Sequence, residues 1–210
     1  MNIYNMNIWQ VFLAGGPVMW PILICSVFAM AIALDKFWYL QKIRIDTKEF
    51  LDGILDRIKR HQIQEALQIC DKTKSPVSLI LKAGILKYDR SRPQIKEAIE
   101  DASLYEIPKL EKNLSILATV AHICPLLGLL GTVTGMVRCF QVIQAKATAF
   151  SPVSPADLAG GIWEALLTTV AGLLVAIPTY VAYNYLVNRV NNFILEMEKA
   201  ATELVNFLTE

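Results

Sequence analysis

One stretch decides the fold: Leu158–Asn188, LAGGIWEALLTTVAGLLVAIPTYVAYNYLVN. It is apolar almost throughout and contains a single charged side chain, Glu164. At 1.5 Å rise per residue it forms roughly 45 Å of helix, which exceeds the ~30 Å hydrocarbon core of a bilayer. The sequence therefore predicts a membrane-spanning helix over 158–188. A charge at the bilayer centre costs about 2.5 kcal/mol or more on insertion scales, so Glu164 is expected to have a function.

Charged residues are segregated along the rest of the chain. Hydrophobic residues make up 54% and charged residues 19% of the 210 residues, with a net charge of +1. Sixteen of the 20 Lys and Arg and 13 of the 19 acids lie between positions 35 and 113, whereas the first 34 residues contain none. This distribution predicts a membrane protein with one polar insertion. No face or arm is persistently basic, so nucleic acid is not an expected partner.

The apolar run Val18–Leu34 predicts the first span, assigned to 17–40 together with its aromatic ends. Residues 1–16 lack the positive region of a signal peptide, so the span is expected to be retained. They contain Trp9 and Phe12 and are predicted to form a periplasmic interfacial segment. Lys and Arg follow the span at once, which places the N-terminus outside the cytoplasm.

Residues 41–113 are predicted to form a cytoplasmic helical domain. Asp46-Thr47-Lys48-Glu49 is typical of a capping box and predicts a helix through about His61, a solvated helix-end residue. Three further helical patterns follow, the last beginning at Ser91. The region has no catalytic triad, phosphate-binding loop or zinc spacing, so the protein is not expected to be an enzyme or to bind a cofactor or metal. The four scattered cysteines are interpreted as small hydrophobic residues.

The charge-free run NLSILATVAHICPLLGLLGTVTGMV, residues 113–137, predicts the second span, assigned to 114–143. Its period continues that of the preceding helix, which predicts one long helix with Pro125 as a candidate bend. Gly131 and Gly135 have the spacing that lets a second helix approach closely. For His122 two interpretations stay open: a proton relay, or a polar residue at the membrane boundary.

A periplasmic loop over 144–157 is predicted to end at a helix start, with Ser154 as N-cap, Pro155 at the first helical position and Asp157 facing the helix dipole. The third span then returns to the cytoplasm, and residues 189–210 continue it as an amphipathic C-terminal helix. The expected fold is an all-α integral membrane protein with three transmembrane helices, N-terminus out and C-terminus in, and long helices extending into the cytoplasmic domain.

The third span carries two threonines next to its acid. On a helical wheel Thr168 lies about 40° from Glu164 and Thr169 about 140° away. One helix face cannot present Glu164 and Thr169 together. A path that uses both must be shared between helices or subunits.

The segments PLLGLLGTVTGM (125–136) and GGIWEALLTTVAGLLVAIPTYVAYN (160–184) resemble the MotA/TolQ/ExbB proton channel family, and most closely its ExbB/TolQ-type biopolymer transport proteins. The resemblance covers essentially the whole chain. It implies that Glu164, Thr169 and Thr132 line the proton path. Trp163 is bulkier than the residues common there, and its effect on the path stays open. The positions expected to act in helix packing or pore shaping are Gly128, Gly131, Gly135, Thr168, Pro178 and Asn184.

The resemblance further implies a ring, usually of five subunits, in the bacterial inner membrane. The ring surrounds a dimer of a single-span partner resembling ExbD or TolR, whose membrane aspartate carries protons, and it acts on a TonB- or TolA-like linker. The predicted function is conversion of proton motive force into mechanical work for TonB-dependent outer-membrane transport or a Tol-type envelope system. The alternatives are a scaffold subunit without an ion path and a gliding- or secretion-type motor stator. A solute transporter is less compatible, because three spans show no inverted repeat.

Overall fold

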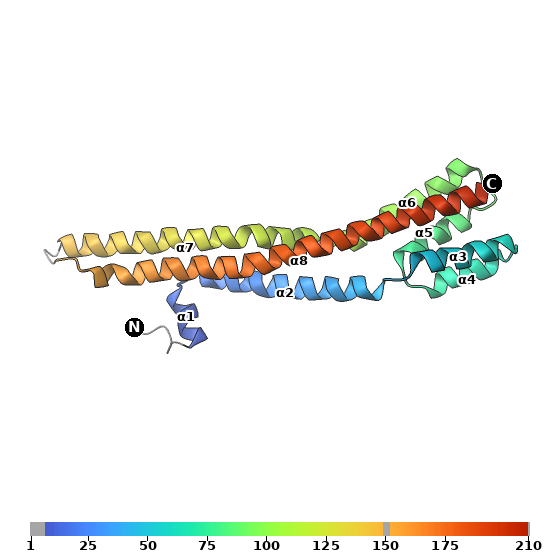
Figure 1. Ribbon diagram of the computed structural model, residues 1–210. Coiled ribbons are helices and arrows are strands. Elements are labelled where there is room, and N and C mark those ends of the chain that lie inside the picture. Colours follow the sequence, from blue (N-terminus) through green and yellow to red (C-terminus); the bar gives the residue numbers. More distant parts are fainter. Residues whose placement is uncertain (1–6, 149–151, 210) are drawn as a thin grey trace. The chain divides into compact units, whose positions relative to one another are not determined.

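The computed structural model describes residues 7–148 and 152–209, and within them every regular element is a helix (Figure 1). The predicted all-α class is confirmed. Parts of three predicted segments lie outside the described residues: 1–6 of the N-terminal segment, 149–151 of the loop, and 210 of the tail. The helices are α1 (Ile8–Ala14), α2 (Met19–Lys42), α3 (Thr47–Lys59), α4 (Ile63–Lys72), α5 (Pro76–Ile85), α6 (Arg92–Glu111), α7 (Leu114–Thr148) and α8 (Pro155–Thr209).

Three helical stretches are long and apolar enough to cross a membrane. They contain α2, α7 and α8, the helices in which the three spans were predicted. Their windows of highest hydropathy are mostly unburied within the chain, as expected where lipid or a neighbouring subunit replaces intramolecular packing. The prediction of three membrane-crossing helices is confirmed.

Two predicted helix starts are present. Asp46 is the N-cap of α3, and its carboxylate accepts from the backbone N–H groups of Lys48 and Glu49. At the start of α8, the Asp157 carboxylate accepts from both the backbone N–H and the hydroxyl of Ser154, at 2.8 Å each. These bonds satisfy polar groups that a helix N-terminus otherwise leaves without partners. The helix α3 ends at Lys59, slightly before the predicted His61, which is exposed and has φ of 58°.

The prediction of one unbroken helix leading into the second span is wrong. The chain is interrupted at Lys112–Asn113, where Asn113 takes a φ of 66°. Asparagine tolerates this left-handed conformation better than most residues, which allows a helix to end there. Buried Lys36 satisfies the last turn of α6, because its Nζ donates to the carbonyls of Lys109 and Leu110 at 3.0 and 3.1 Å. The helix α7 runs uninterrupted through Pro125.

The chain divides into two compact units. The first, called the membrane unit, comprises Met1–Leu34 and Asn113–Asn184, and the second, the helical domain, comprises Asp35–Lys112 and Tyr185–Glu210. The helical domain packs α3 to α6 and the end of α8 around large aliphatic side chains. Its fully buried members include Ile54, Ile80, Leu81, Ile85, Ile95, Leu110 and Leu204.

Candidate functional site

In the membrane unit, α7 and α8 contact each other through glycines. A Cβ atom added at Gly128 would lie 3.0 Å from the Thr169 Cα, and one added at Gly135 would lie 2.9 Å from the Ala165 Cβ. At Gly131 an added Cβ would collide with the Thr168 side chain. The three glycines thus let the two backbones approach more closely than any side chain would allow.

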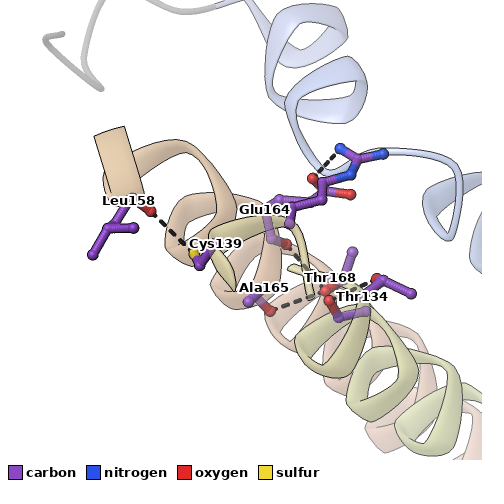
Figure 2. A network of polar contacts seen from close by, with 8 residues as sticks. Thr134, Cys139, Leu158, Glu164, Ala165 and Thr168 are labelled. Carbon is purple, nitrogen blue, oxygen red and sulfur yellow. Dashed lines mark hydrogen bonds and ion pairs between the residues drawn. The ribbon is translucent and has the colours of Figure 1, made fainter. Parts of the chain in front are cut away.

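Glu164 lies within this close contact. It is 4% exposed, and its Oε2 is paired with the Arg138 guanidinium of α7 (Figure 2). Its Oε1 has no hydrogen-bond partner within the described part of the chain. A buried carboxylate with one unsatisfied oxygen is energetically costly unless a proton or a donor reaches it.

The two neighbouring threonines, Thr168 and Thr169, make different contacts. Thr168 is fully buried, and its hydroxyl donates to the carbonyls of Glu164 and Ala165 in its own helix (Figure 2). The Thr169 hydroxyl donates to the Ala165 carbonyl at 3.1 Å and reaches the Gly128 carbonyl of α7 at 3.4 Å. Thr168 therefore packs within the α7–α8 contact, and Thr169 bridges to the α7 backbone.

Other predicted site residues lie apart from Glu164. The Thr132 hydroxyl donates to the Leu129 carbonyl of its own helix at 2.6 Å and makes no hydrogen bond to α8 among the described residues. Pro178 and Asn184 are exposed on α8, more than three helical turns further along. Within one chain Thr168 contacts both the Glu164 carbonyl and Gly131, whereas Thr132, Pro178 and Asn184 lie apart from Glu164.

Two residues with open interpretations have defined surroundings. The Nδ1 of His122 lies 2.6 Å from the Ala118 carbonyl, and the imidazole packs edge-on against Tyr180 with ring centroids 6.2 Å apart. The indole Nε1 of Trp163 is buried and has no hydrogen-bond partner within residues 7–148 and 152–209. Neither side chain forms a hydrogen bond with the Glu164 carboxylate among the described residues.

Arg138 is a site residue that sequence reasoning missed. It directly follows the charge-free run 113–137 of the second span. A signal was available: α7 and α8 are antiparallel helices joined by a short loop, so residues equally distant from its middle face each other. Arg138 and Glu164 each stand thirteen positions from residue 151.

A second missed residue is Gly16, in the turn between α1 and α2. Its φ is 72°, and an added Cβ would lie 2.7 Å from Cδ of Glu164 and would collide with Oε1. The backbone of this turn therefore rests directly on the carboxyl group. Only the glycine pair before Pro17 hinted at an unusual backbone there.

An ion pair joins the ends of α7 and α8 next to the loop. Lys146 Nζ lies 2.6 Å from Asp157 Oδ2. This hydrogen bond, together with those from the backbone and hydroxyl of Ser154, lowers the pKa of Asp157 to about 2. The pair holds the two helices in register close to the site.

Within the described ranges no group of three or more His, Cys, Asp or Glu side chains is placed to hold a metal ion.

Comparison with known proteins gives a consistent result. The sequence profile of the MotA/TolQ/ExbB proton channel family matches residues 54–199. A putative biopolymer transport protein ExbB homolog of Methanothermobacter thermautotrophicus is 30% identical over 193 residues, which cover 91% of this chain and 67% of the relative. The Tol-Pal system protein TolQ of Haemophilus influenzae is 29% identical over 203 residues, which cover 89% of this chain and 87% of the relative. The biopolymer transport protein ExbB of Aquifex aeolicus is 37% identical over 118 residues, which cover 56% of this chain and 76% of the relative.

Proposed function

The chain belongs to the MotA/TolQ/ExbB proton channel family, and we propose that it is the proton-conducting subunit of a membrane motor. Members of this family are channel and transport proteins rather than enzymes, and this multi-pass membrane protein is one of them. Within that class, the proposal assigns proton transfer to Glu164 and the conversion of proton motive force into mechanical work to the assembled complex.

The observation that carries this proposal is the buried carboxyl group of Glu164. It is the one acidic side chain in the apolar segment 158–188 of α8, and only one of its two oxygens has a partner among the described residues. A carboxyl group that is neutral when buried and charged when wetted can carry a proton. Moving one charge through 100 mV releases ~2.3 kcal/mol, enough to bias a conformational cycle.

Thr169 and Thr132 extend the proposed path away from Glu164. Thr169 touches the α7 backbone, whereas Thr132 lies on a separate surface. Hydroxyl groups on separate surfaces of one chain can line one path when copies of the chain stand next to each other. The proposal therefore includes a homo-oligomeric ring, of five subunits by family resemblance, with the path between neighbouring copies.

We further propose that the ring surrounds a dimer of a single-span ExbD- or TolR-like protein with a membrane aspartate, and that it acts on a TonB- or TolA-like linker. The N-terminus would then lie in the periplasm and the C-terminus in the cytoplasm, with the protein in a bacterial-type inner membrane. The relatives include both biopolymer transport proteins and Tol-Pal system proteins, so TonB-dependent transport and a Tol-type system are both compatible with the proposal.

The proposal is tested by two variants with a matched control. Glu164→Gln and Thr169→Val are expected to assemble with the partner and to abolish the proton-motive-force-dependent output of the host. Thr179→Val is the control, because Thr179 is also buried in α8 and also donates to its own helix, at Val175. Normal output from both site variants would refute the proposal.

A scaffold without an ion path is the second candidate, and one observation favours it. The Arg138–Glu164 ion pair joins α7 to α8, as a purely structural acid would. Under this alternative Glu164→Gln loses assembly, because it removes the charge that pairs with Arg138. Quantifying the co-purified partner separates the two functions: an assembled but inactive complex supports conduction, and a lost complex supports the scaffold.

A further inference from the structure

The turn Gly15–Pro17 covers the Glu164 carboxyl group. Gly16 approaches so closely that a single added carbon would collide with Oε1, the oxygen that has no partner within the described ranges. Its left-handed φ of 72° brings the backbone into this position, and a residue with a side chain adopts that conformation only at a cost. The cover therefore depends on glycine at position 16.

The same contact explains why Glu164 is buried although it lies close to the end of its helix. Pro155 begins α8, so Glu164 is only about 14 Å along the helix from its start. The Arg138 side chain, which pairs with this carboxylate, is 51% exposed. The guanidinium is thus open to the surroundings while the carboxylate beneath the turn is sealed.

The turn is held in place by contacts that could be released together. The Gly16 N–H donates to the Leu13 carbonyl at 3.2 Å, which links the turn to α1. The Trp9 and Phe12 rings of α1 pack against Trp20 at the start of α2, with centroids 6.4 and 5.1 Å from it. The helix α1 is short, and Trp9 and Trp20 are largely exposed, so the main anchor of the turn is this aromatic cluster.

We propose that Gly16 and Arg138 are positioning residues for Glu164: the turn is a cover that must lift before water or a proton carrier reaches Oε1, while Arg138 holds the carboxylate beneath it. This inference rests on the proposed function, because a sealed carboxyl group matters for conduction only if Glu164 carries protons. Lifting the turn admits a donor to Oε1, and protonation then releases the guanidinium. When the carboxyl group has passed its proton on to water or to the proton carrier, closing the turn restores the sealed ion pair.

The test measures the accessibility of Glu164 in the full-length protein, assembled with its partner in membranes. A water-soluble carbodiimide with glycine ethyl ester converts accessible carboxyl groups to amides, and mass spectrometry quantifies the product at Glu164 relative to exposed Glu49. Gly16→Ala is expected to raise the labelling rate roughly tenfold, the factor that corresponds to the strain of an L residue in a left-handed conformation.

Gly15→Ala is the matched control. It adds the same methyl group one residue earlier, where the added carbon meets the buried Met19 side chain, with Cγ at 2.5 Å, rather than Glu164. Labelling of this variant is expected to match the wild type. Should Gly16→Ala not assemble, Trp9→Ala gives the second route, because it weakens the aromatic anchor of α1 and should also raise labelling. Unchanged labelling in the assembled variants would overturn the cover.

Arg138 is tested by conservative rescue. Arg138→Gln leaves a buried carboxylate without its partner, which favours uptake of a proton and exposure of the group, so labelling should rise; Arg138→Lys keeps the charge and should restore the wild-type rate. Equal labelling in Gln and Lys variants would contradict the positioning role. The labelling experiment does not depend on proton transport. If the substitutions leave the labelling of Glu164 unchanged, the turn is not a cover. If the Glu164→Gln complex still conducts protons, the proposed function is wrong.

Discussion

The two units of this protein are packed in opposite ways. The helical domain buries large aliphatic side chains, with Ile54, Leu81 and Ile95 completely inaccessible. The membrane unit packs α7 against α8 through glycines, buries Glu164 and Thr168, and leaves large apolar side chains such as Phe28 exposed. Water drives the first arrangement, because burying apolar area is favourable there. Lipid provides no such drive, so close backbone packing and polar pairing take its place.

Because of this difference, the two units should tolerate different substitutions. The helical domain should be sensitive to the loss of volume and the membrane unit to its addition. Both units bury polar side chains, but Lys36 and Ser78 of the helical domain donate to backbone carbonyls, whereas one oxygen of Glu164 has no partner among the described residues. Function follows the same division, since the one buried acid with an unsatisfied oxygen among the described residues lies where lipid replaces water.

The largest effect is expected from removing volume in the helical domain. Leu81→Ala leaves a cavity in its core and should lower the free energy of unfolding by roughly 2–5 kcal/mol. Leu79→Ala, two residues earlier in α5, is the control, because Leu79 is 44% exposed and little packing is lost. Thermal unfolding in detergent micelles measures both. Equal losses would show that α5 is not packed as described.

The next effect is the addition of a methyl group in the membrane unit. A Cβ added at Gly161 would lie 2.6 Å from the Gly135 carbonyl oxygen, whereas one added at the adjacent Gly160 meets nothing within 4 Å. Gly161→Ala should therefore destabilise the α7–α8 contact by about 1–3 kcal/mol, the usual cost of overpacking. Gly160→Ala should be neutral or slightly stabilising, because alanine favours helix. The same unfolding experiment distinguishes the two variants, and a reversed order would contradict the close packing.

A smaller effect is expected at a helix cap of the helical domain. Asp46→Ala removes the acceptor for the N–H groups of Lys48 and Glu49 and should cost about 1 kcal/mol. Asp46→Asn keeps an acceptor oxygen and should recover most of the stability. Loss of the same size in both variants would mean that the cap contributes through its charge alone.

The smallest effect concerns pH and the Lys146–Asp157 pair. The pKa of Asp157 falls from its usual 3.8 to about 2 in the folded protein, so the pair stabilises the fold fully above about pH 4. This stabilisation is lost as the pH falls through about 2, below which the carboxylate is protonated in both the folded and the unfolded state. In Asp157→Asn the corresponding step in thermal stability between pH 4 and 2 should be smaller. Identical pH profiles for wild type and variant would exclude the pair as its source.

Much of the fold could be predicted because it depends on local pattern. Apolar length identified the three spans, and Asp46 and Ser154 marked helix starts through hydrogen bonds within a few residues. The break at Asn113 was missed because the helical period continues through it, and Lys36, which satisfies the carbonyls there, is 73 or more positions away. Long-range contacts of this kind leave no local signal.

Only part of the candidate site could be predicted from the sequence. Glu164 was evident as one charge in an apolar run. Its surroundings were not: Arg138 required the register of an antiparallel helix pair, and Gly16 required a backbone conformation that only the folded turn reveals. Thr132 was taken from family resemblance, and within the described chain it lies apart from Glu164. Its place in the path is a prediction about assembled subunits.

The most direct test of the central claim is proton flux through the purified complex reconstituted in liposomes, followed with an internal pH-sensitive dye under an imposed gradient. The account predicts measurable flux with the wild-type chain and its loss with Glu164→Gln in a complex of unchanged composition. Wild-type flux through an intact Glu164→Gln complex would contradict the account.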